Sequence, residues 1–463
     1  MEFSREWVEE KLEWTLGHCS EGTDGLEAMF YGCNANNMRL AESTIVQASD
    51  ITRGKVSFRA LVGNRQARAS TTDLSNRGLR ECASRAIESA KQTPVSAEQV
   101  TLPHPSLAGP ESTPAVFEGI LGLDSATKKE WLKEGLAAHR SDDLALAGRF
   151  HTGVSTWAVR STVGMEAYHQ GSWVDLALSA LERPAGHRAS SSRVFFDGGI
   201  EREQLSSLAE EVRGECHRAH GPKELEPGEW DVVLAPMAVA ELLEWLGMIA
   251  FNSQPFDDGT SCIYDRVGKK ITGGAISIFD DASIPHGVGV PLPFDIEGVA
   301  KKKVELITAG VAKGIVHDSL TAGRHGCQST GHAQTSDDFP SAGSQASHLH
   351  IAAGEGDQGT MVQSVKRGIL VTRFHYVNGM IEPRRAVMTG LLRDAAFLIE
   401  DGRLKHAVSP MRFTDSILEA FDRIPGKAGV SRQTEAHCSF FGPLQCTVAP
   451  SLLIPRLKFT SGR

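Results

Sequence analysis

The sequence lacks a hydrophobic run long enough to cross a membrane. Its longest apolar stretch, residues 238–251, contains Glu241 and Glu244, whereas a transmembrane helix needs about 20 largely apolar residues. The first residues, MEFSREWVEEKLEW, carry charges where a secretory signal peptide has its apolar segment. We therefore expect a cytoplasmic protein that makes no contact with a membrane.

Paired cysteines and an excess of positive charge are also missing. The eight cysteines show no Cys-x-x-Cys pair and no regular spacing, which favours reduced thiols over a disulfide framework. With 48 Lys and Arg against 57 Asp and Glu, the formal net charge is −9, which argues against a nucleic-acid surface. The absence of Gly-x-Ser-x-Gly leaves an α/β-hydrolase nucleophile without support.

The length of 463 residues exceeds what one hydrophobic core usually serves, so two domains are expected. A polar stretch rich in glycine and proline, near 221–228, separates an N-terminal α/β domain at 1–222 from a C-terminal domain at 228–463. In the first domain the order helix, strands, helix occurs twice, which suggests a duplicated half. The expected strands are 27–31, 38–47, 55–61, 66–71, 144–152, 155–161, 165–169 and 172–180.

The second domain has the pattern of antiparallel β structure. Residues 348–353 and 369–376 are short runs rich in β-forming residues. Residues 396–400 and 404–408 flank Asp401-Gly402, the two-residue signal of a type I′ hairpin. Turn residues recur to the end of the chain, so we predict an α+β protein whose C-terminal domain is rich in β-strands and barrel-like.

Four phrases carry a family resemblance: PFDIEGVAKKKVELITAGVAKGIVHD from Pro293, LTAGRHGCQSTGHA from Leu320, VTRFHY from Val371 and TGLLRD from Thr389. Together with residues 231–459 around them, they resemble the C-terminal domain of the TldD/PmbA family. Members of that family are intracellular metallopeptidase subunits called TldD and TldE. The resemblance implies an N-terminal α/β domain that contributes to the contact between subunits.

The helix after the boundary strand carries His-Glu-x-x-x-His in active relatives, where two imidazoles bind the metal and the carboxylate can act as general base. The corresponding window here is LEWLGM, residues 243–248, so Leu243 and Met248 stand where the histidines belong and only Glu244 is retained. Leucine has no lone pair, and a thioether is a poor ligand for such an ion. We expect no catalytic residue, metal or cofactor in this chain, and a buried helix face at Leu243. Cys438 and Cys446 lie near the position of the family's third ligand and are expected to be small buried residues or free thiols.

This departure, and the phrase STGHA from Ser329, resemble the TldE (PmbA) side of the family. The implied function is that of a catalytically silent subunit of a heterodimeric metallopeptidase, which completes a peptide channel for a TldD-like partner. The partner would bring the divalent metal, expected to be zinc. Unfolded peptides, modified precursors of natural products and intermediates released from a carrier protein all stay open as substrates.

Within the phrases VTRFHY and TGLLRD, we predict that Arg373, His375, Arg393 and Asp394 bind peptide, because arginine can hold a carboxylate through two hydrogen bonds. The competing interpretation is a structural Arg–Asp pair at a sheet edge.

Two other functions stay open. His348-Leu-His350 places two imidazoles on one face of a strand, which would suit an autonomous metalloenzyme; otherwise we expect both histidines to face solvent. The family's older label, modulator of DNA gyrase, suggests a regulatory binding protein that acts without catalysis.

Overall fold

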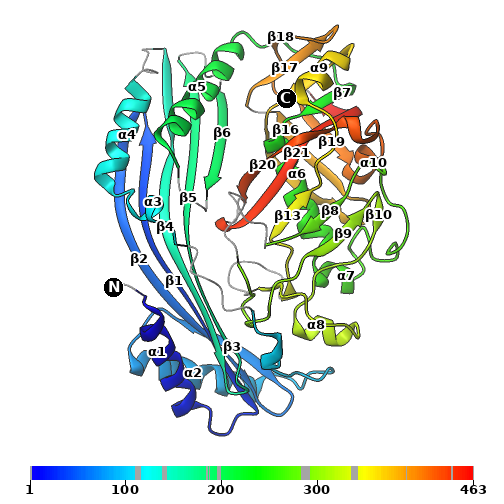
Figure 1. Cartoon of the computed structure of the whole chain (residues 1–463). Coiled ribbons are helices and arrows are strands. Elements are labelled where there is room, and N and C mark those ends of the chain that lie inside the picture. Colours follow the sequence, from blue (N-terminus) through cyan, green and yellow to red (C-terminus); the bar gives the residue numbers. More distant parts are fainter. Residues whose placement is uncertain are drawn as a thin grey trace.

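The computed structural model describes residues 3–109, 116–137, 143–183, 186, 188–195, 200–282, 292–334, 343–392, 394–439 and 442–461. Two large β-sheets, with helices packed on them, make up the molecule (Figure 1). The fold is α+β, as predicted. Each helix in the described part of the chain is too short or too polar to span a bilayer.

The first sheet is antiparallel and has the order β3-β2-β1-β4-β5-β6. Its strands are β1 (Gly25–Ala41), β2 (Thr44–Leu61), β3 (Gln66–Thr71), β4 (Leu144–Ser161), β5 (Glu166–Glu182) and β6 (Arg188–Phe195). The helices of this part are α1 (Arg5–Cys19), α2 (Asn76–Gln92), α3 (Glu118–Leu121), α4 (Ser125–Ala137) and α5 (Arg202–Arg218). Helix, three strands and helix therefore occur twice, and the two sets of strands meet at β1 and β4 in the middle of the sheet.

The strand boundaries differ from the sequence prediction. Residues 27–31 and 38–47 were expected to be two strands, but β1 runs continuously from Gly25 to Ala41, and the turn to β2 comes at Glu42 and Ser43, both with positive φ. β4 and β5 likewise each join two expected strands. Asn34 to Asn37 have low strand propensity, but pairing with β2 on one side and β4 on the other satisfies their backbone groups.

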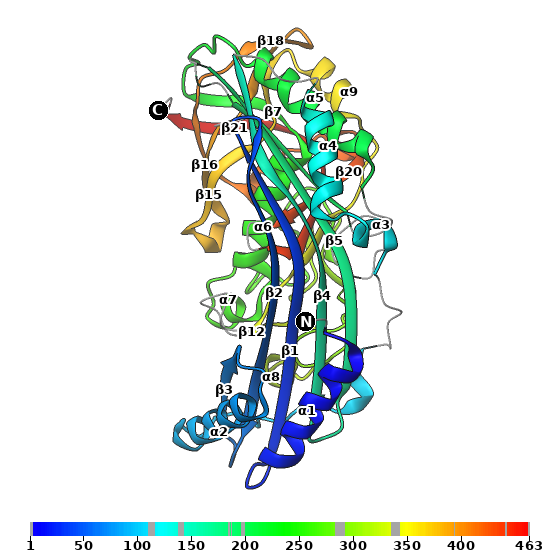
Figure 2. The same cartoon turned by 90° about the vertical axis from the view of Figure 1, so that its left-hand side faces the viewer.

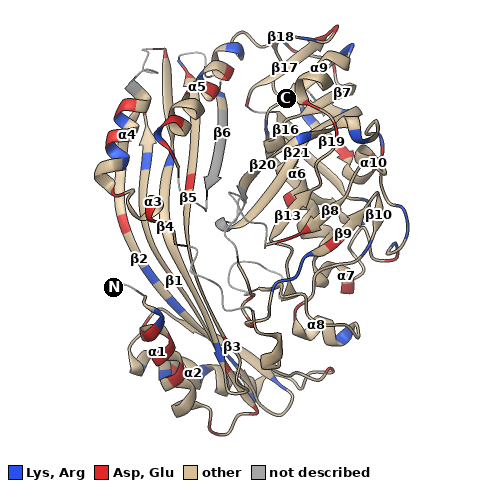
Figure 3. Ribbon diagram, in the orientation of Figure 1, with Lys and Arg blue, Asp and Glu red and all other residues tan. Residues whose placement is uncertain are grey.

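The helices cover one face of this sheet, which we call the outer face; Figure 2 views it directly. Leu26 and Phe30 of β1 and Phe58 of β2 lie in a core cluster with residues of α1 and α2. The opposite, inner face points toward the C-terminal half, where Met29 and Trp157 pack with residues 294–299. Acidic and basic residues are interspersed along α4 and α5 (Figure 3).

The second sheet contains strands from Gly228 onward. Its main order is β10-β9-β8-β13-β21-β7-β14-β17-β18, with β15, β16, β19 and β20 attached to it. The longer strands are β7 (Gly228–Leu234), β9 (Val304–Thr308), β13 (His348–Ile351), β14 (Arg367–Val371), β15 (Phe374–Glu382), β16 (Val387–Leu392), β17 (Ala396–Glu400), β18 (Arg403–Ala407), β19 (Arg412–Ser416), β20 (Val430–Ser439) and β21 (Gly442–Ser461). The short strands are β8 (Ile278–Asp280) and β10 (Val311–Ala312), and a separate pair is formed by β11 (Ala333–Gln334) and β12 (Gly343–Ser344).

Most neighbours in this sheet are antiparallel, but β7 with β14 and β13 with β21 are parallel. Through the described residues, the sheet ends at β10 and β18 instead of closing into a barrel. Its helices are α6 (Pro236–Leu246), α7 (Ser253–Asp257), α8 (Ser319–Arg324), α9 (Gln358–Ser364) and α10 (Ile417–Asp422).

In the second sheet, one predicted hairpin is present, whereas one predicted strand is interrupted. Asp401 and Gly402 have φ of 48° and 71°, the positive values that a type I′ turn requires. The expected strand 369–376 is interrupted, because β14 ends at Val371 and β15 begins at Phe374. Arg373 occupies the break.

The two sheets share a core at one end of the molecule. Leu208 and Val212 of α5 belong to a cluster that contains Phe150 of the first sheet and Leu370 and Phe397 of the second. In Figure 1, α5 lies beside the first sheet, on the side near β17 and α9. The division at 1–222 and 228–463 stays a prediction, and the packing joins the two parts.

Candidate functional site

The site is built around α6, the helix that follows the boundary strand β7. Pro236 occupies the first turn, where its missing N–H breaks no hydrogen bond. A π-helical turn, Gly247–Phe251, continues the helix, and a Cβ on Gly247 would lie 2.3 Å from Leu349 Cδ1, so a larger residue would require the Leu349 side chain to move. Turns of this kind are frequent at functional sites.

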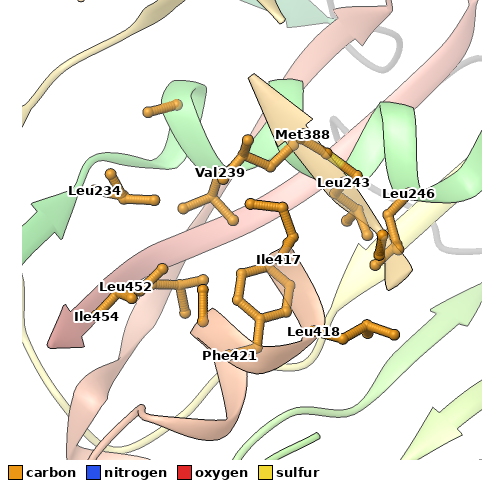
Figure 4. Packing of buried hydrophobic residues seen from close by; sticks show 14 of the residues in the cluster. Leu234, Val239, Leu243, Leu246, Met388, Ile417, Leu418, Phe421, Leu452 and Ile454 are labelled. Carbon is orange, nitrogen blue, oxygen red and sulfur yellow. The ribbon is translucent and has the colours of Figure 1, made fainter. Parts of the chain in front are cut away.

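Leu243 lies in the hydrophobic core. Its side chain is fully buried, as are Leu242 and Leu246, so the predicted apolar helix face is confirmed. Figure 4 shows Leu243 beside Met388 and Leu246, within a cluster that also contains Phe421. A side chain at this position is therefore enclosed by hydrocarbon.

Glu244 and Met248 lie on another face of the helix. They are four residues apart, the spacing that places side chains on one face, and both line a small cavity with Gln345, Ser347 and Thr447. Its volume of about 10 Å³ is close to what one water molecule needs. The structure thus brings Glu244 and Met248 together but directs Leu243 elsewhere. We call this space the α6 cavity.

A buried polar network supports Ser347 at the α6 cavity. Lys301 Nζ donates to Ser347 Oγ at 2.5 Å, and Asp280 accepts the backbone N–H of Ser347 at 2.7 Å. The other Asp280 oxygen lies 2.9 Å from His332 Nε2. Burial alone would raise the pKa of Asp280, but His332 and Lys301 outweigh it and hold the pKa far below its usual value. The network therefore holds an ionised carboxylate behind the cavity.

Cys446 lies on β21, but not on the cavity face of the strand. Its neighbours Gln445 and Thr447 line the α6 cavity, and successive strand residues point to opposite faces. Burial raises the pKa of Cys446 to about 12, so the thiol stays protonated at neutral pH. The side chain of Cys438 lies outside the described residues.

Arg373 is held between two carboxylates. Its Nε lies 3.0 Å from Glu241 on α6, and its Nη1 lies 3.8 Å from Asp394. Glu241 also accepts the backbone N–H of Phe374 at 2.9 Å. Burial raises the pKa of Glu241 to about 7, although Arg373 counteracts it. Sequence reasoning missed Glu241, because nothing near it in the sequence signals a partner 132 positions away.

The remaining predicted contact residues are only partly brought together. His375 lies on β15, opposite Leu391 of β16, and is half-buried. Arg393 lies outside the described residues. Peptide binding by Arg373, His375, Arg393 and Asp394 stays a prediction.

The expectation that His348 and His350 face solvent is wrong. They are 2% and 4% exposed, because β13 is an inner strand between β8 and β21. His350 Nε2 lies 3.1 Å from the Asp281 carbonyl and its ring stacks on Phe279. His348 Nδ1 lies 3.0 Å from Ser347 Oγ. Within the described ranges, no three His, Cys, Asp or Glu side chains are grouped so that they could hold a metal ion.

Comparisons with known proteins identify the family to which the chain belongs. Residues 227–461 match the model of the PmbA/TldA metallopeptidase C-terminal domain, and residues 27–90 match PmbA/TldA metallopeptidase domain 1. An uncharacterized protein of Methanocaldococcus jannaschii is 33% identical over 223 residues, which cover 47% of this chain and 50% of that protein. A metalloprotease of Methanothermobacter thermautotrophicus is 22% identical over 259 residues, 56% of this chain and 55% of the relative.

The chain thus spans about half the length of the curated relatives it matches. The crystal structure of TldE from Thermococcus kodakarensis aligns with a TM-score of 0.84 at 20% identity, covering 97% of this chain and 100% of that one. The fold is therefore shared over nearly the whole chain.

Proposed function

The chain belongs to the TldD/PmbA metallopeptidase family, and on that premise we propose that it is a catalytically silent, TldE-like subunit of a heterodimeric metallopeptidase. Its TldD-like partner would supply the metal ligands and the activated water, with zinc as the expected ion. This chain would complete the channel in which a peptide lies, and the assembly would work in the cytoplasm.

One observation carries the proposal: the chemistry of the side chains on α6. A catalytic divalent ion needs several nitrogen, oxygen or thiolate ligands that converge. Leu243 has no lone pair and is buried in the core, and Met248 offers only a thioether. Glu244 is then the one ionisable ligand that the window supplies. The residues do not fit the metal of the active relatives, so we assign this chain no step in hydrolysis.

The residues at the α6 cavity and Arg373 would instead help to position the peptide. Ser347 and Thr447, which line the α6 cavity, are neutral hydroxyl groups, and Lys301 and Asp280 hold Ser347 in place. Arg373 has Glu241 and Asp394 close by, so a peptide carboxylate would have to compete with both. We therefore expect Arg373 to reach a peptide carboxylate only when Glu241 is protonated, and otherwise to order the start of β15. Unfolded peptides, modified precursor peptides and carrier-released intermediates all suit such a channel.

The test is a reconstitution. The purified chain should contain no stoichiometric metal and should cleave no peptide, whereas adding a TldD-like subunit that bears His-Glu-x-x-x-His should yield chelator-sensitive cleavage. A partner whose two motif histidines are replaced by alanine is the matched control and should yield none. Peptide cleavage by this chain alone, abolished by chelator, would overturn the proposal. Metal analysis of His348→Ala/His350→Ala beside the wild type tests an autonomous metalloenzyme, which requires metal in the wild type and its loss in the variant.

A further inference from the structure

A large cavity lies on the outer face of the first sheet, away from α6. Its volume of about 950 Å³ is within the range of small-molecule sites. Strands β1, β2, β4 and β5 form its base, while Phe3 and Ser4 before α1 and residues 120–126 around α3 and α4 form its walls. In Figure 2, the strands between α1 and α3 are left bare by the helices. We call this space the outer-face cavity.

The charges that line the outer-face cavity have one sign. Its described lining contains two carboxylates, Asp50 and Asp124, and no Lys, Arg or His. Asp124 accepts the backbone N–H of Thr127 and so begins α4, whereas Asp50 lies in the middle of β2. Apolar side chains, among them Phe3, Ile120 and Leu123, make up much of the walls, and Leu121 is 58% exposed. The cavity therefore combines carboxylates with hydrophobic side chains.

Asn36 links the two sides of the cavity. Its Nδ2 donates to Asp50 Oδ1 at 2.6 Å and to Ser125 Oγ at 2.5 Å. These bonds fix the amide, and they leave Asn36 Oδ1 buried with no hydrogen-bond partner. The Asn36 amide therefore ties β1 to β2 and to the start of α4 at this end of the cavity.

Lys128, on α4 beside the cavity, is fully buried. Its Nζ donates to the Asn36 carbonyl at 2.6 Å, to Thr152 Oγ1 at 3.1 Å and to the Phe150 carbonyl at 3.3 Å. An ammonium has three N–H donors, so all three are used inside the protein. Lys128 therefore has no donor left for an anion in the cavity; burial lowers its pKa to about 7, although the nearby Asp50 counteracts this shift.

We propose that the outer-face cavity binds an organic cation, an ammonium or guanidinium group carried on an apolar body. The cationic group pairs with Asp50 through a charge-assisted hydrogen bond, and the apolar body lies against Ile120, Leu121 and Leu123. The proposal is independent of the metallopeptidase assignment, because the lining of the outer-face cavity shares no residue with the α6 cavity.

Benzamidine is a suitable probe, with the neutral isostere benzamide and the anion benzoate as comparisons. Binding is measured by saturation-transfer NMR and by calorimetric titration of the full chain. Benzamidine should bind at least about tenfold more tightly than benzamide, because only the cation forms the charged pair, and benzoate should not bind. Equal affinity for benzamidine and benzamide, or tighter binding of benzoate, would overturn the proposal.

Two variants assign the binding to this cavity. Asp50→Asn should weaken benzamidine binding about tenfold and keep the Asn36 contact, whereas the exposed Asp401→Asn should leave it unchanged. Leu121→Arg, at an exposed position, should repel the cation without disturbing the fold, and Leu404→Arg on β18 is its control. Benzamidine affinity that survives both Asp50→Asn and Leu121→Arg would sink the proposal.

The cation could be free or part of a peptide. Blocked Ac-Leu-Arg-Leu-amide, compared with Ac-Leu-Gln-Leu-amide, distinguishes the two sources. Tighter binding of the arginine peptide than of benzamidine, lost in Asp50→Asn, would identify a basic peptide side chain as the ligand. Binding of benzamidine with no binding of the arginine peptide would identify a small free cation.

Discussion

Arg59 on β2 forms a buried ion pair with Glu297, 238 positions away in the C-terminal half of the chain. The Arg59 and Glu297 side chains are 5% and 3% exposed. A second carboxylate, Glu27 on β1, lies 2.8 Å from the other end of the same guanidinium. Glu297 belongs to the phrase DIEG from Asp295, so a family motif is used to join the inner face of the first sheet to the second half of the chain.

Replacing Arg59 with methionine should destabilise the protein strongly. The variant leaves Glu297 buried without its ion-pair partner and Glu27 with only the 3.5 Å contact to Arg68, and loss of one partner of a buried pair costs about 3–5 kcal/mol. Arg77→Met is the matched control, because Arg77 pairs with Glu81 on the exposed surface of α2, where pairs contribute about 0–1 kcal/mol. Urea unfolding of the three proteins measures the difference. Equal midpoints for Arg59→Met and Arg77→Met would contradict the role of this pair.

How far the sequence predicts the site depends on whether the determining contacts are local. Asp401-Gly402 was identifiable because its turn depends on two adjacent residues. The buried face at Leu243 follows from helical spacing. Glu241 was missed because its partner, Arg373, comes from a different element. His348 and His350 were misjudged for the same reason, since β8 and β21, which bury them, lie about 70 and 100 positions away.

The phrase STGHA shows where a family motif could have pointed to structure. His332 is buried and lies 2.9 Å from Asp280, so it supports the network behind the α6 cavity. The motif located the residue but not its partner. Similarly, the window that corresponds to the metal motif was found by its position after β7. Its sequence did not show that Glu244 and Met248 line the α6 cavity while Leu243 lies in the core.

Restoring histidines to α6 should have unequal effects at its two positions. Leu243→His places an imidazole in a fully apolar environment with no partner, and we expect a loss of about 3 kcal/mol in the free energy of unfolding. Met248→His faces the α6 cavity and Glu244, so it should change stability by less than about 1 kcal/mol. Neither single variant should bind stoichiometric zinc. Chemical unfolding and metal analysis check both expectations, and a stable Leu243→His protein would contradict the position of Leu243.

The Asp280–His332 pair should make stability depend on pH in acid. The pKa of Asp280 in the folded protein lies below its value in an unfolded chain, so its contribution is complete above about pH 4 and is lost as pH falls. Asp280→Asn should therefore be less stable than wild type by roughly 2–4 kcal/mol at pH 7, with the gap narrowing below pH 4. Asp422→Asn, at an exposed position, should follow the wild-type curve. A gap that stays constant down to pH 2 would show that the carboxylate charge is not the cause.

Glu241 should produce the opposite pH dependence, in a higher window. Burial raises its pKa from 4.5 to about 7, so between these values the folded protein holds a proton that the unfolded chain has released. Stability from this group is therefore complete below about pH 4.5 and declines as pH rises to about 7. Glu241→Gln should lack that decline, and Glu419→Gln, whose partner Arg385 is exposed, should retain it.

Thermal unfolding from pH 4 to pH 8 separates two roles for Arg373. If the decline is present in wild type and absent in Glu241→Gln, Glu241 is protonated for part of this range and Arg373 is then free to contact a peptide carboxylate. If wild type instead gains stability over Glu241→Gln as pH rises, Arg373 keeps Glu241 ionised and serves as a structural clamp between α6 and β15. The second result would remove Arg373 from the predicted peptide contacts and leave His375 and Asp394 as the described candidates.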